Sequence, residues 1–80
     1  MEQSIKEGIT MSLAFAPYGK EVEVTKINAD DKTRKHLNDL GIAVGGRVTS
    51  IFDSKGDVIL KVKDGRLALN RALAMKIIVQ

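Results

Sequence analysis

The chain has 80 residues with a hydrophobic fraction of 44% and a formal net charge of +3 at pH 7, which suits one small domain and supports solubility more than dedicated nucleic-acid binding. It contains no cysteine, so disulfides, thiolate zinc sites and thiol nucleophiles are excluded. No apolar run approaches the roughly 18 residues that cross a bilayer, and the N-terminus lacks the apolar core of a signal peptide, so we expect a soluble cytoplasmic protein without membrane insertion.

The N-terminal part of the chain divides into an extension and the start of a domain. Residues 1–10 are mostly polar, and we expect them to lie outside a domain that covers residues 11–80. Ser12 can cap a short turn through residues 13–15, which Pro17 would end.

The first strand is predicted by the alternation in residues 21–25. Val22 and Val24 alternate with Glu21, Glu23 and Thr25, which is typical of a strand with one buried face. Ile27 falls out of phase with the two valines, so a bulge or bend is expected before it.

The next segment changes from strand to helix periodicity. Asp30 or Asp31 can accept hydrogen bonds from the free amides of a first helical turn. Leu37 and Leu40 follow three residues apart on one face, and Gly41 can take the left-handed conformation that ends a helix. One short amphipathic helix of about three turns is therefore predicted.

From Gly45 and Gly46 onward the pattern is mainly that of strands. Asp64-Gly65 is a two-residue hairpin signal between two of them. The elements expected in order are a strand over 47–52, a turn over 53–57, an alternating strand around Val58–Val62, its partner around Leu67–Leu69, a single turn over 71–74 capped by Asn70, and a last strand over 76–79. About five short strands and one short α-helix predict a mainly β fold, either a small barrel or a rolled sheet.

Residues that could support catalysis or hold a metal are few. His36 is the only histidine and stands beside Asp39 at a spacing of three, but one imidazole and one carboxylate make an incomplete site. We therefore expect neither an enzyme nor a resident metal or cofactor. The glycines match no nucleotide-binding pattern, and those assigned to structural turns are Gly41, Gly45, Gly46 and Gly65.

Nucleic-acid binding is the alternative function that the sequence leaves open. Basic residues cluster on the helix and around the predicted hairpin, namely Lys32, Arg34 and Lys35 in the first case and Lys61, Lys63 and Arg66 in the second. Single-strand readers also need exposed aromatic platforms. The aromatics are only Phe15, Tyr18 and Phe52. We assign Phe15 and Phe52 to the core, so nucleic acid is not the expected partner.

Three segments resemble the FeoA family of small SH3-like barrels. They are Leu37–Gly45, with its Leu-Gly-Ile turn, Gly65–Leu69, and Arg71–Val79. Val44 departs from the pattern, since members often have proline there. The resemblance implies an SH3-like barrel that works in the cytoplasm, without catalysis, on the ferrous-iron transporter FeoB, with its GTP-binding domain as the expected contact. It also implies a role in Fe(II) uptake and the binding of transition-metal ions.

The surface that we expect to meet this partner combines the helix with the loop that follows it. Its residues are Lys32, Arg34, Lys35, Leu40, Ile42 and Val44. Leu37 is expected to be in the core. A hydrophobic patch at the barrel mouth would equally serve a second copy of the chain, so self-association is left open.

Overall fold

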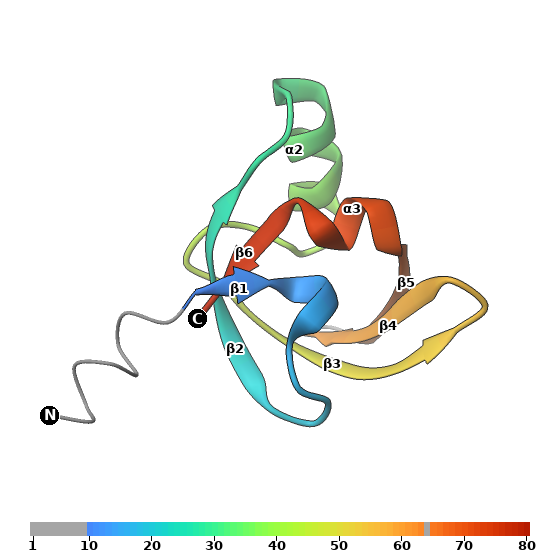
Figure 1. Ribbon diagram of the computed structural model, residues 1–80. Coiled ribbons are helices and arrows are strands. Elements are labelled where there is room, and N and C mark those ends of the chain that lie inside the picture. Colours follow the sequence, from blue (N-terminus) through green and yellow to red (C-terminus); the bar gives the residue numbers. More distant parts are fainter. Residues whose placement is uncertain (1–9, 64) are drawn as a thin grey trace, which may run out of the picture.

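The computed structural model describes residues 10–63 and 65–80 (Figure 1). These residues form one sheet of six strands, in the order β1-β6-β2-β3-β4-β5, and every pairing is antiparallel. The elements are β1 (Met11–Ser12), the 3-10 helix η1 (Leu13–Phe15), β2 (Glu21–Ile27), α2 (Asp31–Asp39), β3 (Arg47–Ser54), β4 (Asp57–Val62), β5 (Gly65–Asn70), α3 (Arg71–Met75) and β6 (Ile77–Val79).

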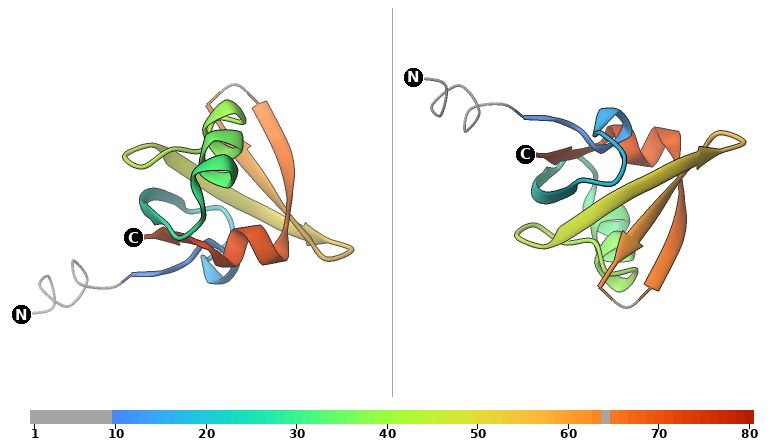
Figure 2. Two further views of the ribbon diagram at one scale, coloured as in Figure 1. Left: turned by 90° about the horizontal axis from the view of Figure 1, so that it is seen from above. Right: turned by 90° about the horizontal axis from the view of Figure 1, so that it is seen from below.

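The sheet curls into an SH3-like barrel, which confirms the expected mainly β fold (Figures 1 and 2). The two-residue strand β1 was not expected, and it adds to the edge of β6. The turn expected after Asn70 is the short helix α3, capped as predicted by the Asn70 side chain, which accepts a 2.8 Å hydrogen bond from the Leu73 amide. α3 packs against η1.

Strand β2 turns the corner of the barrel. Its first part, Glu21–Glu23, pairs with β3, whereas Val24 and the residues after it pair with β6. The register with β6 shifts between Val24 and Lys26, which confirms the irregularity expected before Ile27. The shift lets Ile27 join Val22 and Val24 in the core, because the extra residue reverses the side of the sheet to which later side chains point.

The hairpin between β3 and β4 is tighter than the sequence indicated. The strands continue to Ser54 and resume at Asp57, so only Lys55 and Gly56 form the loop. Both have positive φ, 52° and 87°, as a two-residue loop between right-twisted strands requires. This hairpin projects beyond the barrel (Figure 2).

The hairpin between β4 and β5 is present, but Gly65 is not one of its turn residues. Gly65 is the first residue of β5 and pairs with Val62, so its assignment to the turn was wrong by one position. It has φ 149°. Asp64, the other residue of the predicted turn, lies outside the described residues.

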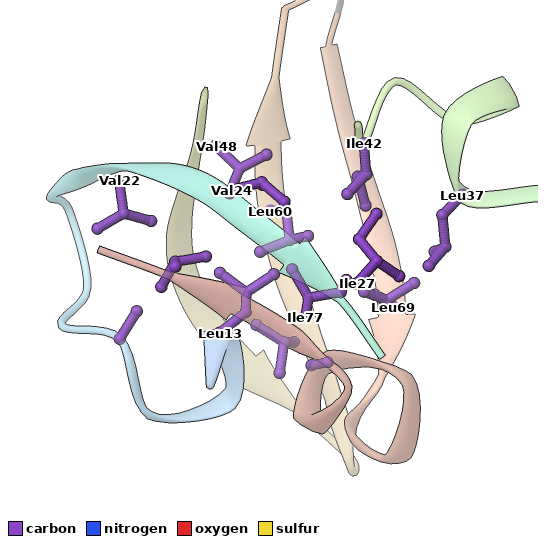
Figure 3. Close-up of a cluster of buried hydrophobic side chains, with 14 residues drawn as sticks. Leu13, Val22, Val24, Ile27, Leu37, Ile42, Val48, Leu60, Leu69 and Ile77 are labelled. Atoms are coloured by element: carbon purple, nitrogen blue, oxygen red, sulfur yellow. The ribbon is translucent and has the colours of Figure 1, made fainter. Parts of the chain in front are cut away.

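The core fills the interior of the barrel with aliphatic side chains from almost every element (Figure 3). The alternation in β4 is confirmed, since Val58 and Leu60 are buried. The buried residues are Leu13, Ala16, Val22, Val24, Ile27, Leu37, Ile42, Val48, Val58, Leu60, Leu69, Ala74, Ile77 and Val79, with Ser50 as the polar member.

The placement of Phe15 and Phe52 in the core was wrong. Their exposed fractions are 62% and 46%. In η1, Leu13 takes the core position instead. In β3, the register with β4 shifts between Ser50 and Phe52. Without that bulge Phe52 would follow Val48 and Ser50 on the inner face, and with it Phe52 faces outward.

Candidate interaction surfaces

The helix α2 begins at a well-formed cap. The Thr33 amide donates a hydrogen bond of 2.8 Å to Oδ1 of Asp30, which is the N-cap residue. Hydrogen bonds from Thr33 hold the pKa of Asp30 below its ordinary value of 3.8, because they favour the charged carboxylate. Within the first turn, Arg34 is ion-paired with Asp31. The sequence predicted this start correctly.

The helix ends in a Schellman motif, a pair of backbone hydrogen bonds around a left-handed residue. Gly41 has φ 100°, and its amide donates to the Asn38 carbonyl at 3.0 Å. The Ile42 amide then donates to the Leu37 carbonyl at 2.9 Å. This arrangement commonly brings the side chains at the two ends of the longer bond into contact, and Leu37 and Ile42 are both fully buried (Figure 3).

Ile42 therefore does not belong to the partner-binding surface to which we assigned it. Its side chain has no exposed area, because the motif that ends the helix turns residue 42 inward. Leu40 and Val44 remain at the surface, with exposed fractions of 37% and 60%. From here on, the exit surface means Lys32, Arg34, Lys35, Leu40 and Val44.

The loop that carries Val44 is hydrogen-bonded to strand β2 of the barrel through the two residues that follow Val44. Gly45, with φ 92°, donates to the Val24 carbonyl at 2.8 Å, and the Val24 amide donates to Gly46 at 2.9 Å. Gly46 closes the loop by donating to the Ala43 carbonyl at 2.9 Å. A side chain at position 46 would lie 3.2 Å from that carbonyl oxygen, so the turn roles of Gly45 and Gly46 are confirmed. Val44 is thus presented on backbone that is held in place.

No metal site is visible around His36 among the residues that the structure describes. Among residues 10–63 and 65–80, no three side chains of His, Cys, Asp or Glu are grouped so that they could hold a metal ion. The same residues include no helix that is long and apolar enough to cross a membrane.

A second exposed apolar surface, which the sequence analysis missed, lies where η1 meets α3. The guanidinium group of Arg71 makes three contacts within this surface. Its Nη1 donates to Oδ2 of Asp53 at 3.1 Å, its Nη2 donates to the Ala14 carbonyl at 3.3 Å, and its Cζ lies 5.8 Å from the centre of the Phe15 ring. That distance is within the range of a cation–π contact. We call Phe15, Tyr18, Arg71 and Met75 the aromatic surface.

The composition of the aromatic surface is that of an interface centre. Tyr18 and Met75 are exposed together with Phe15, and aromatic residues, Met and Arg are enriched in protein interfaces. Arg71 and Met75 stand four apart on α3 and so share one side of the helix. The signal available in the sequence was the position of Phe15 and Tyr18 beside Pro17, outside any alternating strand.

The pKa of Tyr18 depends on Asp53, the residue that is ion-paired with Arg71. A hydrogen bond to the Asp53 side chain is the main reason that the pKa of Tyr18 is raised above 10.0, with desolvation and the charge of Asp53 acting in the same direction. Arg71 opposes the shift. Asp53 thus raises the pKa of Tyr18 and is also ion-paired with Arg71 at the end of β3.

Together these features define a small SH3-like barrel whose described surface offers exposed apolar patches for contact with another molecule. Comparison with known proteins gives the family. The FeoA domain profile matches residues 11–80, and the chain belongs to the FeoA family.

Named relatives agree with this assignment. The chain is 41% identical over 68 residues to a Methanocaldococcus jannaschii protein named as an Fe(2+) transport protein A, covering 85% of this chain and 83% of that protein. It superposes on the crystal structure of an iron uptake regulatory protein (FeoA) with a TM-score of 0.81 at 24% identity, covering 90% and 96% of the two chains. A FeoA-like protein from Clostridium acetobutylicum gives 0.77 at 22% identity, with coverage of 89% and 85%.

Proposed function

We propose that this protein is a non-enzymatic accessory protein of Fe(II) uptake, which acts in the cytoplasm by binding a FeoB-type transporter near its GTP-binding domain. The observation that carries the proposal is the FeoA match across residues 11–80, joined to the 41% identity with a protein named for Fe(2+) transport. Binding without catalysis agrees with a described surface whose main features are apolar and basic patches.

The exit surface is the contact that we assign to the transporter. Leu40 and Val44 supply exposed apolar area on backbone that is fixed at both ends, by the helix cap and by the bonds to Val24. Little conformational entropy is lost when such a preorganised loop binds. Lys32, Arg34 and Lys35 lie on the adjoining helix, where cations steer an acidic partner and set the rate of encounter.

The experiment compares two substitutions of equally exposed apolar residues. Val44→Asp places a charge in the exit surface, and Phe15→Ser alters the aromatic surface, with exposed fractions of 60% and 62% in the starting protein. We expect the cytoplasmic domain of the organism's own FeoB-type transporter to be retained by wild-type protein and by Phe15→Ser, and to be lost with Val44→Asp. In a strain that lacks the protein, wild-type protein and Phe15→Ser should restore Fe(II) uptake, whereas Val44→Asp should not.

Two results would contradict parts of this proposal separately. Loss of retention with Phe15→Ser, but not with Val44→Asp, would move the contact to the aromatic surface and leave the function intact. Unchanged Fe(II) uptake in the deletion strain, with no transporter domain retained by the wild-type protein, would refute the function itself.

A further inference from the structure

The outer face of strands β2, β3 and β4 carries a groove that the proposed function does not use. Its volume is about 400 Å³, within the size range of small-molecule sites. The three strands lie side by side in the sheet (Figure 1). The residues that line the groove are Glu21, Arg47, Thr49, Lys61, Val62 and Lys63.

The strand register explains why these side chains converge. Glu21 is paired with Thr49, Thr49 with Lys61, and Lys61 with Arg66, so one row crosses four strands. Val48 and Leu60, the neighbours of Thr49 and Lys61, are buried. Because side chains alternate along a strand, this row must face outward.

The charge in the groove is unbalanced in favour of cations. Arg47, Lys61 and Lys63 face a single carboxylate, Glu21, which leaves a formal charge of +2 on the lining. The carboxylate of Glu21 is ion-paired with Arg47, since its Oε1 lies 3.5 Å from Nη1 of Arg47. Within the described residues, Lys61 and Lys63 take part in no ion pair.

Two further residues stand at the rim of the groove with opposite charges. Arg66 is paired with Lys61 across the β4–β5 ladder, and Glu23 is paired with Arg47 across the β2–β3 ladder. Their effects on an anion in the groove oppose each other, so the net positive lining is preserved.

We propose that this groove binds a phosphate group, carried either by a small free compound or by a lipid headgroup. A phosphate monoester carries a charge of about −1.5 to −2 near pH 7, which matches the lining better than a single carboxylate does. The ammonium groups of Lys61 and Lys63 and the hydroxyl of Thr49 would donate hydrogen bonds to its oxygens.

The test is a titration of the full chain, labelled with 15N, followed by amide chemical shifts. The probes are inorganic phosphate, GTP, a single-stranded DNA oligonucleotide, and vesicles of phosphatidylcholine with or without phosphatidic acid, whose headgroup is a phosphate monoester. We expect saturable changes at Thr49, Lys61 and Val62, and none at Lys32 and Lys35 on α2. Lys61→Gln should weaken binding by up to about fivefold, as expected for one exposed charge pair, whereas the control Lys35→Gln removes the same charge from α2 and should leave binding unchanged.

The probes separate the two sources of phosphate. Saturable binding of GTP or inorganic phosphate that depends on Lys61 supports a free ligand, and Lys61-dependent binding to vesicles that contain phosphatidic acid supports a headgroup. Equal weakening by Lys61→Gln and Lys35→Gln would overturn the proposal, as would no saturable shift with any of these probes. Binding of single-stranded DNA through the groove, with no response to the other probes, would also overturn it in favour of a polymer site. None of these readouts involves iron uptake, so the proposal stands apart from the proposed function.

Discussion

The backbone amide of Ile42 donates a hydrogen bond of 2.9 Å to the carbonyl of Leu37, and the side chains of both residues are fully buried. This bond ends α2, and the two buried side chains anchor the end of the helix to the core of the barrel. It divides the segment that follows the helix, because residue 42 points inward while Leu40 and Val44 stay exposed. The apolar part of the exit surface therefore consists of two exposed side chains on either side of a buried one.

Substitution of Ile42 by alanine should destabilise the fold rather than weaken a contact with a partner. Truncating a fully buried isoleucine typically lowers the free energy of unfolding by about 2–5 kcal/mol. Val44→Ala is the matched control, and a substitution at an exposed position usually changes stability by less than about 0.5 kcal/mol. Urea denaturation followed by circular dichroism measures both. Equal losses for the two variants would show that residue 42 is not the core anchor.

The sequence predicted most of the fold because the signals were local. Alternation identified β2 and β4, Asp30 and Asn70 identified two helix caps, and Gly41 identified the end of α2. Each of these depends on residues within a few positions of one another.

The errors came from features that depend on distant partners. A bulge in β3 is defined by its register with β4, so nothing near Phe52 showed that its ring would turn outward. The inward turn of Ile42 follows from the core that the barrel offers to it. The aromatic surface exists because Arg71 reaches Ala14, which is 57 positions away in the chain. No pattern within a short window of sequence contains that contact.

Ser50 offers a second test of the core. In contrast to Ile42→Ala, a substitution that removes the Ser50 hydroxyl should stabilise the protein. Its Oγ is buried and has no hydrogen-bond partner among the described residues, and an unsatisfied buried hydroxyl costs about 1–3 kcal/mol. Ser50→Ala leaves the carbonyl that accepts from Gly19 in place. We expect the free energy of unfolding to rise by about 1 kcal/mol, since a small cavity offsets part of the gain.

Ser12→Ala is the contrasting control for this measurement. The Ser12 hydroxyl caps η1 and donates to the Ala74 carbonyl at 3.0 Å, so its loss should lower stability by about 1 kcal/mol. A decrease for Ser50→Ala as large as that for Ser12→Ala would mean that the Ser50 hydroxyl has a partner.

The cap of α2 should make stability depend on pH through Asp30. The folded-state pKa of Asp30 lies below its ordinary value of 3.8 because of the hydrogen bonds from Thr33. Its contribution to stability is therefore fully present above that value and is lost as the pH falls through the lower folded-state value. Asp30→Asn keeps a good capping side chain but cannot titrate.

The measurement is urea denaturation of wild type and Asp30→Asn from about pH 7 down to about pH 2. We expect the wild type to lose more stability than the variant over the acid part of this range. Parallel curves would show that the Asp30 carboxylate is not held by Thr33.

Tyr18 is the only tyrosine in the chain, so its ionisation can be followed directly by ultraviolet absorbance. Its pKa is raised above 10.0, mainly by the hydrogen bond to Asp53. Asp53→Asn removes the charged acceptor and its Coulombic effect, while Arg71, whose charge lowers the pKa, remains. The midpoint of the titration should therefore move to lower pH in Asp53→Asn. Asp57→Asn, on the other side of the same hairpin loop, should leave it unchanged. If both variants titrate like the wild type, the Asp53 carboxylate does not join Tyr18 to Arg71, and the aromatic surface lacks the support that would keep it preorganised for a partner.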